Sequence, residues 1–149
     1  ARHARRKGRG KRRMIYGIGV DTASAARLEK SIARAHFVQR VFGPEERALL
    51  QGRSPAHRAE TAAANFAAKE ALAKALGTGL SGFVWVQAQA LRAPNGAPYF
   101  AFSGRLAETM RQKGLAAHLS ITHEGGFATA FVVLEQAARP AAHTTEATE

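Results

Sequence analysis

Five short segments of the chain are rich in apolar residues and have strand character, and one of them, 83–91, alternates between apolar and polar positions. These segments are 15–20, 83–91, 99–102, 117–122 and 127–134. An Asn-Gly pair at 95–96 is a strong turn signal, so it predicts that the second and third strands form a hairpin. The last two strands are separated only by 123–126, which contains two glycines and predicts a second hairpin.

Elsewhere apolar residues recur at helical spacing. The pattern predicts helices over 23–35 with an apolar continuation to 42, over a long central segment that includes 66–77, and over 104–113. Pro44 fits the first position of a further helix, because proline lacks the N–H group that stays unpaired there. The central helix follows a loop at 51–58 and is expected to end at Gly77, in the left-handed conformation that glycine adopts without strain.

The order of elements is a strand, helices, a hairpin, a helix and a second hairpin, and this order predicts an α+β fold. We expect its antiparallel sheet to pack on the long central helix. A length of 149 residues with 46% hydrophobic content suits a single domain with its own core, and we place that domain at residues 14–136. The sequence contains no internal repeat.

The formal net charge of +11 is concentrated at the start of the chain. Residues 1–13 hold 8 of the 22 Lys and Arg side chains and no acid, whereas the remainder holds 14 basic and 11 acidic side chains. We expect this basic leader to be disordered, because it is self-repelling and poor in apolar residues. It is either a functional arm or an upstream extension of a domain that starts at Met14. A disordered tail is expected at 137–149.

The sequence excludes several kinds of site and location. No apolar run approaches the ~18 residues of a membrane-spanning helix. Because the chain has no cysteine, it forms neither disulfides nor thiolate zinc sites, and we expect a cytoplasmic location. The leader lacks the apolar core of a secretory signal. His118 and His123 point to opposite faces if their strand is continuous, so they are not expected to share a metal.

The central helix presents a carboxylate among small apolar side chains. Glu70 lies one turn after Phe66 and one turn before Lys74, on a face that also carries four alanines. Such a carboxylate must be paired or must hold a metal, because an isolated buried charge is strongly unfavourable. The alternative is an exposed Glu70 and Lys74 pair at i,i+4 spacing, which contributes little to stability.

Two other places carry candidate chemistry. Asp21 ends the first strand, where it is either a site carboxylate or the N-cap of the following helix. The loop at 51–58 contains Arg53, His57 and Arg58. These three side chains could hold phosphate groups, or they could simply face solvent.

Four segments resemble, in order and at matching separations, the motifs of one enzyme family. They are IYGIGVD at 15–21, FAAKEALAKALGTG at 66–79, NGAPY at 95–99 and HLSITH at 118–123. These segments look like the successive motifs of the holo-acyl-carrier-protein synthases, which are small 4′-phosphopantetheinyl transferases. The resemblance covers about residues 14–135, and four ordered motifs make it far more specific than any one of them.

The resemblance implies transfer of phosphopantetheine from coenzyme A to a serine of acyl carrier protein, with release of adenosine 3′,5′-bisphosphate. It also implies that Asp21 and Glu70 hold Mg²⁺ on the pyrophosphate of coenzyme A. This agrees with the ligand preference of Mg²⁺, which takes a few carboxylates together with water and phosphate oxygens. Glu70 itself, a water held by Glu70 and the substrate phosphate are all candidates for the acceptor of the serine proton.

Other residues receive roles from the same resemblance. Lys74 is expected beside the phosphates as a third catalytic residue, and Gly77 and Gly79 are expected in the turn that contacts coenzyme A. His118 and His123 are expected near the active site or the 3′-phosphate. The resemblance further implies a compact homotrimer in which coenzyme A lies between neighbouring subunits.

A basic first helix binds the carrier protein in the family, and the motif arginine falls on Arg27. Arg34 follows seven residues later, so a helix over 23–35 would place both guanidinium groups on one face. Such a basic stripe would attract an acidic carrier protein. The alternative is an ordinary solvated arginine balanced by its neighbours.

Three positions depart from the family pattern. Ser24 stands where the family usually has a glutamate, so the metal has one carboxylate fewer nearby. Asn65 stands where many members have an arginine, which removes one phosphate partner. Glu124 replaces a small hydroxyl residue and adds negative charge beside the expected nucleotide. These departures concern coenzyme A affinity more than the chemistry.

A second class of function is a small nucleic-acid-binding module that uses the basic leader for phosphate affinity. The body of the chain lacks the interleaved aromatic and basic face of single-strand binders, so no nucleic acid partner is expected.

Overall fold

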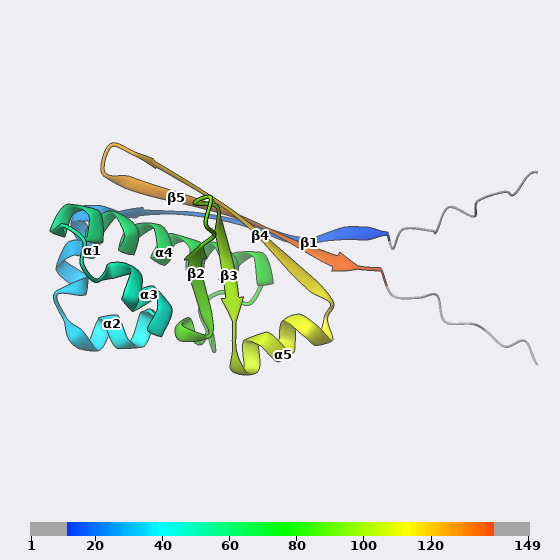
Figure 1. Ribbon diagram of the computed structural model, residues 1–149. Coiled ribbons are helices and arrows are strands. Elements are labelled where there is room, and N and C mark those ends of the chain that lie inside the picture. The colour runs from blue at the N-terminus through cyan, green and yellow to red at the C-terminus, as the bar shows by residue number, and fades with distance from the viewer. Residues whose placement is uncertain (1–11, 139–149) are drawn as a thin grey trace, which may run out of the picture.

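An antiparallel sheet of three strands, in the order β1-β5-β4, runs along one side of the molecule (Figure 1). The computed structural model describes residues 12–138. The strands are β1 (Arg13–Ser24), β4 (Leu115–Glu124) and β5 (Phe127–Ala137). Strands β4 and β5 form the hairpin that the sequence predicts, and β1 pairs with β5 along its full length. The prediction of an α+β domain with an antiparallel sheet is confirmed.

The long helix α4 (Pro55–Leu76) lies across the inner face of this sheet. Two glycines of β1 allow the strand to approach the helix backbone directly. A Cβ at Gly19 would lie 1.9 Å from the carbonyl oxygen of Ala71, and one at Gly17 would lie 2.0 Å from that of Ala75. No larger residue fits at either position, so these glycines set the distance between β1 and α4.

The core forms between the alanine-rich face of α4 and the inward-facing residues of the sheet. On β5 these residues are Ala128, Ala130, Val132 and Leu134, which alternate with exposed or half-buried neighbours. Small side chains on both elements let the helix pack closely on the sheet. Helix α4 ends at Gly77 in the left-handed conformation (φ 76°), as predicted.

Three short helices cover one end of α4: α1 (Ala25–Ile32), α2 (Ala35–Val41) and α3 (Pro44–Leu50). Pro44 occupies the first position of α3, as predicted. The prediction of one helix over 23–35 is wrong, because β1 continues to Ser24 and the helical run then breaks after Ile32. Arg34 is the N-cap of α2, so it does not lie on the same helix as Arg27.

The second hairpin consists of β2 (Ala88–Arg92) and β3 (Pro98–Phe102), joined by the predicted Asn-Gly turn. The expected strand over 83–91 begins late, because a 3₁₀ turn, η1 (Trp85–Gln87), precedes β2. In this turn the ring of Trp85 stacks on Phe66, with the ring centroids 5.2 Å apart. This aromatic contact fixes the segment against α4 instead of in a sheet. Helix α5 (Gly104–Gln112) then leads to β4.

The outer face of the three-stranded sheet carries an apolar patch and, within the described residues, no helix. Ile18, Val20 and Phe131 lie on it with 60%, 53% and 44% of their surface exposed. Val20 is paired directly with Phe131, and Ile18 with Val133, so these side chains form one patch across β1 and β5. We call Ile18, Val20, Phe131 and Val133 the outer patch.

The predicted leader and tail lie outside the described residues except at their inner ends. Arg13 and Ala137 form the first pair of the β1–β5 ladder, so the sheet extends slightly beyond the predicted limits of the domain. Over residues 12–138, every helix is too short or too polar to cross a membrane.

Candidate active site

Asp21 and Glu70 come together where β1 passes over α4. Asp21 lies on the inner face of β1, two residues beyond Gly19, and its side chain is 15% exposed. Burial raises the pKa of the Glu70 carboxyl, and the charge of Asp21 together with a hydrogen bond between the two carboxyl groups raises it further. Two acids therefore share a half-buried place, as the sequence and the resemblance led us to expect.

Two cations flank this pair of acids. Lys74 Nζ donates hydrogen bonds to the Val20 carbonyl oxygen at 2.9 Å and to Asp21 Oδ1 at 3.1 Å. The Arg27 guanidinium lies 5.6 Å from the ring centroid of Phe66, and its charge lowers the pKa of Glu70, as that of Lys74 does. Lys74 thus pairs with Asp21 on the facing strand, and the simple helical pair of Glu70 with Lys74 is not formed.

The two carboxylates of this site are ligands that fit Mg²⁺. Two carboxylates that repel each other are relieved by a divalent cation, and Mg²⁺ completes its shell with water and phosphate oxygens. Over residues 12–138 there is no cluster of three or more His, Asp or Glu side chains, as a closed transition-metal site would need. Ser24, which stands where the resembled family usually has a glutamate, adds no carboxylate to the site. Its hydroxyl accepts a hydrogen bond from the Arg27 backbone N–H at 3.3 Å and caps α1.

The two histidines lie away from the acids and on opposite faces of β4. His118 is on the outer face, where its Nε2 lies 2.9 Å from Glu135 Oε1. His123 is on the inner face, at the end of the sheet edge formed by β4, whereas Asp21 is on the opposite edge strand. The prediction that the histidines do not share a face is confirmed. Within one chain, neither histidine is brought to the Asp21 and Glu70 pair. Gly77 and Gly79, in contrast, directly follow the last turn of α4, which carries Lys74.

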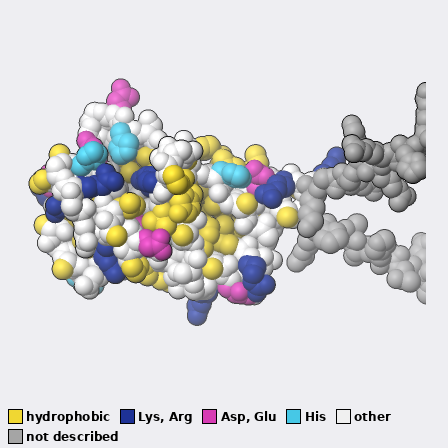
Figure 2. All heavy atoms as spheres, viewed as in Figure 1, with side chains coloured by type: hydrophobic (Ala, Val, Ile, Leu, Met, Phe, Trp, Pro, Cys, Tyr) yellow, Lys and Arg dark blue, Asp and Glu magenta, His cyan; other side chains and the backbone are white. Residues whose placement is uncertain are grey.

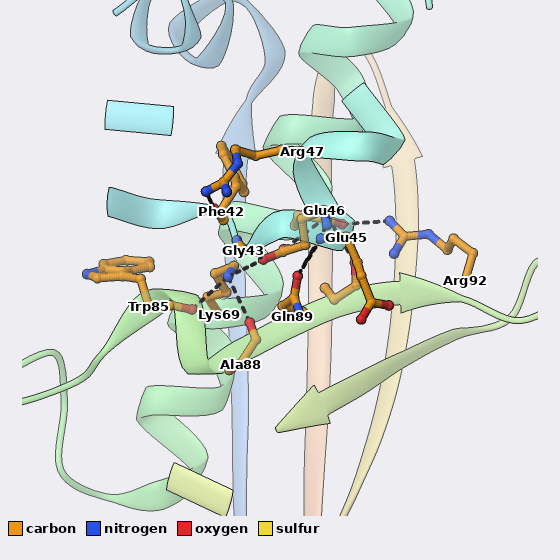
Figure 3. Close-up of polar contacts among 12 residues, drawn as sticks. Phe42, Gly43, Glu45, Glu46, Arg47, Lys69, Trp85, Ala88, Gln89 and Arg92 are labelled. Atoms are coloured by element: carbon orange, nitrogen blue, oxygen red, sulfur yellow. Dashed lines mark hydrogen bonds and ion pairs between the residues drawn. The ribbon is translucent and has the colours of Figure 1, made fainter. Parts of the chain in front are cut away.

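A buried ion pair lies behind the site, and sequence reasoning missed it (Figure 3). Glu46 and Lys69 are both fully buried. The ammonium of Lys69 donates to Glu46 Oε1, to the Trp85 carbonyl at 2.8 Å and to the Ala88 carbonyl at 2.7 Å. Burial raises the pKa of Glu46 and lowers that of Lys69, while their mutual attraction opposes both shifts. The pair ties α3, α4 and β2 together next to Glu70.

Asn65 extends this network to the hairpin. Its side-chain amide donates to Glu46 Oε2 at 3.1 Å and to the Ala90 carbonyl at 3.0 Å. Its Oδ1 accepts a hydrogen bond from Arg92 Nη2 at 2.9 Å. Asn65 is fully buried, so it faces the interior of the protein rather than a ligand. The sequence signal for this network was the alanine-rich stretch 62–73 around Asn65 and Lys69, which predicts that this part of the helix is buried.

Comparisons with known proteins show what the whole chain is similar to. Residues 17–132 match the model of the 4′-phosphopantetheinyl transferase superfamily. A holo-[acyl-carrier-protein] synthase of Herminiimonas arsenicoxydans is 43% identical over 129 residues, which are 83% of this chain and 99% of the relative. One of Anaeromyxobacter dehalogenans is 45% identical over 130 residues, which are 83% and 98% of the two chains. The crystal structure of a holo-(acyl-carrier-protein) synthase from Bacillus anthracis in complex with CoA (3′,5′-ADP) has a TM-score of 0.71 at 34% identity and covers 83% of this chain and 99% of its own.

Proposed function

The chain belongs to the 4′-phosphopantetheinyl transferase superfamily, and from this we infer that it is a holo-acyl-carrier-protein synthase. It transfers the 4′-phosphopantetheine group of coenzyme A to a serine of apo acyl carrier protein and releases adenosine 3′,5′-bisphosphate. The relatives support this activity and not the binding of nucleic acid. The observation on this chain that carries the assignment is the half-buried pair of Asp21 and Glu70 beside Lys74.

The reaction exchanges one phosphorus–oxygen bond for another. The serine oxygen of the carrier bonds to the phosphorus that bears pantetheine, the bond from this phosphorus to the nucleotide phosphate oxygen breaks, and the serine proton is released. Asp21 and Glu70 would hold Mg²⁺, which neutralises negative charge on the reacting phosphates when it is bound. Lys74 stands at hydrogen-bond distance from Asp21 and adds a positive charge on the same side. The position of these three side chains is fixed by the contact of Gly19 with α4.

We also propose that the protein is a homotrimer. The outer patch leaves large apolar side chains in solvent on a sheet face that nothing covers within residues 12–138, which is typical of an interface between subunits. The expected nucleotide-binding histidine His123 lies on the opposite sheet edge from Asp21. A site shared between neighbouring subunits would bring the two edges to one coenzyme A.

The proposed carrier-binding residue is Arg27. It lies on the exposed side of α1, with its guanidinium above Phe66 and near Glu70. An acidic carrier protein docked at this helix would present its serine next to the pair of acids. A cytoplasmic location, expected from the cysteine-free sequence, stays a prediction.

Mass spectrometry of an apo carrier protein tests the activity. The carrier is incubated with this protein, coenzyme A and Mg²⁺, and we expect its mass to increase by one phosphopantetheine group. A double variant, Asp21→Asn with Glu70→Gln, serves as the control and should leave the carrier unmodified. If the wild-type protein adds no mass to a range of apo carrier proteins, the proposed function is wrong.

A further inference from the structure

A cavity of about 160 Å³ lies between α5 and the segment 78–84, which follows α4. Its apolar lining includes Leu76, Phe83 and Leu106, and the hydroxyl groups of Thr78 and Ser81 also face it. None of its lining residues is among those expected to bind Mg²⁺, coenzyme A or the carrier protein. The cavity is therefore separate from the site around the two acids.

Helix α5 presents one face to this cavity. Arg105, Thr109 and Lys113 line it and follow one another at intervals of four residues, which places them on the same side of the helix. The acid of this helix, Glu108, does not line the cavity, and its carboxylate pairs with Arg111 instead. Figure 2 shows Lys and Arg side chains at both ends of α5. The helix thus offers positive charge to the cavity and directs its negative charge elsewhere.

Hydrogen bonds hold the walls of the cavity in place. Gln87 Oε1 accepts a hydrogen bond from the Leu106 N–H at 3.1 Å, and the Gln87 carbonyl accepts one from the Ser103 N–H at 3.0 Å. These two bonds join η1 to the start of α5. At the other end of the helix, Lys113 Nζ donates to the Tyr16 hydroxyl at 3.1 Å. The cavity is therefore enclosed by elements that are fixed to one another.

Both cations of the cavity lack an acidic partner. Within residues 12–138, neither Arg105 nor Lys113 forms a salt bridge, and no acidic side chain lines the cavity. The backbone carbonyl of Arg105 accepts a hydrogen bond from the Thr109 hydroxyl, but its guanidinium donates none within the described part of the chain. A guanidinium has five N–H donors, and its bonds to anions are the stronger, charge-assisted kind. These donors are available to a ligand.

We propose that this cavity binds a small organic anion with an apolar body, of the class of a short alkyl carboxylate, and that Arg105 anchors its charge. The two cations favour an anion, and the apolar lining favours an alkyl chain, because burial of both surfaces from water is favourable. The volume suits a short chain, since drug-sized ligands occupy cavities of about 300–1,000 Å³. The inference does not depend on the proposed function.

The cavity lies next to the last turn of α4. Leu76 and Thr78 line it on either side of Gly77, which ends this helix. Lys74 belongs to the same turn, but its ammonium reaches β1, where it bonds to the Val20 carbonyl and to Asp21. An anion in the cavity would therefore contact the end of α4 without contacting the two acids. We expect it to bind at the same time as coenzyme A.

Titration calorimetry of the full chain with sodium hexanoate tests the inference. We expect one hexanoate to bind per chain. Hexan-1-ol lacks the charge and inorganic phosphate lacks the alkyl chain, so each should bind about tenfold more weakly or worse. From butyrate to hexanoate, affinity should rise by up to about fourfold per methylene group. Saturating coenzyme A should leave the Kd for hexanoate unchanged.

Three variants at exposed positions locate the binding site. Arg105→Gln should weaken hexanoate binding about tenfold, because charge-assisted hydrogen bonds are lost, and should leave the weak binding of hexan-1-ol unchanged. Ser81→Phe places a large side chain in the cavity and should prevent binding of both compounds. Arg111→Gln is the matched control, because it removes an arginine of the same helix outside the cavity, and it should leave the Kd unchanged.

Three results would overturn the inference. The first is a wild-type protein that does not bind hexanoate. The second is an equal loss of affinity in Arg105→Gln and Arg111→Gln, which would show general attraction to a basic helix. The third is competition between hexanoate and coenzyme A, which would place hexanoate in the nucleotide site. The transfer of phosphopantetheine is tested separately by the mass of the carrier protein.

Discussion

The carboxylates of Asp21 and Glu70 repel each other, and the proposed Mg²⁺ would remove this repulsion. We expect Asp21→Asn and Glu70→Gln each to lower kcat/KM by about a hundredfold or more, because each removes a charged group from a site whose role is electrostatic. Both variants should also need more Mg²⁺ for half-maximal rate. Turnover measured against Mg²⁺ concentration checks this, with the exposed Glu29→Gln as a control. Near-normal turnover of both variants at low Mg²⁺ would show that the metal assignment is wrong.

The raised pKa of Glu70 predicts how stability depends on pH when no metal is present. Because its pKa is higher in the folded protein, the folded state holds the proton more tightly than the unfolded chain does. The free energy of unfolding therefore falls as pH rises from the ordinary pKa of glutamate through the raised one. Glu70→Gln should lack this fall and should be at least as stable as the wild type at neutral pH in the presence of a chelator.

Thermal unfolding between about pH 4 and pH 8 measures this effect. Added Mg²⁺ at neutral pH should raise the Tm of the wild type and leave that of Glu70→Gln nearly unchanged. Parallel curves of Tm against pH for the two proteins would contradict the assignment of the raised pKa to Glu70.

Lys69 and Lys74 lie on the same helix but in opposite surroundings, and this gives a matched pair of variants. Lys69→Met leaves Glu46 buried without its partner, so we expect a loss of about 3–5 kcal/mol in the free energy of unfolding. Lys74→Met breaks a pair whose lysine is 55% exposed and should change stability by at most about 1 kcal/mol. Urea unfolding measures both values. If Lys69→Met lowered the free energy of unfolding as little as Lys74→Met does, the buried network would contribute little to stability.

Helix α1 is the element that would meet the carrier protein. Arg27→Ala should raise KM for the carrier severalfold and leave KM for coenzyme A almost unchanged, because the arginine attracts an acidic partner. The defect should shrink as added salt screens the wild-type enzyme. Steady-state kinetics at two salt concentrations measure both constants. A loss that appears equally in KM for coenzyme A, or that ignores salt, would place Arg27 in the nucleotide site or in the fold.

Local patterns predicted most elements well where a single residue decides the structure. Gly77 ends α4 and Pro44 begins α3, because each has a backbone preference that its surroundings do not override. The end of β1 was misjudged, since Asp21 looked like a helix cap. The strand continues because its residues up to Ser24 pair with β5, a partner more than a hundred residues away. Pairing over such a distance leaves no local signal.

The candidate site likewise contains residues that local sequence signals identify and residues whose roles depend on distant parts of the chain. The acids at 21 and 70 were found because a carboxylate among alanines is a local signal and because four motifs resembled one family. The roles of Lys69 and Lys74 could not be told apart from spacing alone, since both fall on the same alanine-rich helix. Burial of Lys69 depends on Glu46 and on two carbonyl groups of the hairpin segment, which only the folded chain brings to it.

The outer patch predicts the oligomeric state of the whole molecule. Phe131→Asp places a charge in the middle of it, so we expect the trimer to dissociate and activity to fall with it. Light scattering at the assay concentration measures the mass. Tyr99→Asp, which changes an exposed aromatic residue of β3 outside the patch, is the control and should leave both mass and activity unchanged. An active wild-type monomer would remove both the trimer and the shared site.

The pairing of β1 with β5 also fixes where the two ends of the domain leave it. Arg13 lies opposite Ala137, and the backbone N–H of Ala138 donates to the Arg12 carbonyl at 2.9 Å, so both ends emerge side by side (Figure 1). Asp21 lies eight residues further along the same strand, at a distance of about 25 Å. Any sequence joined to either end therefore begins far from the reacting phosphates. Extensions or further domains joined at either end would therefore leave open the proposed entrance for the carrier protein at α1.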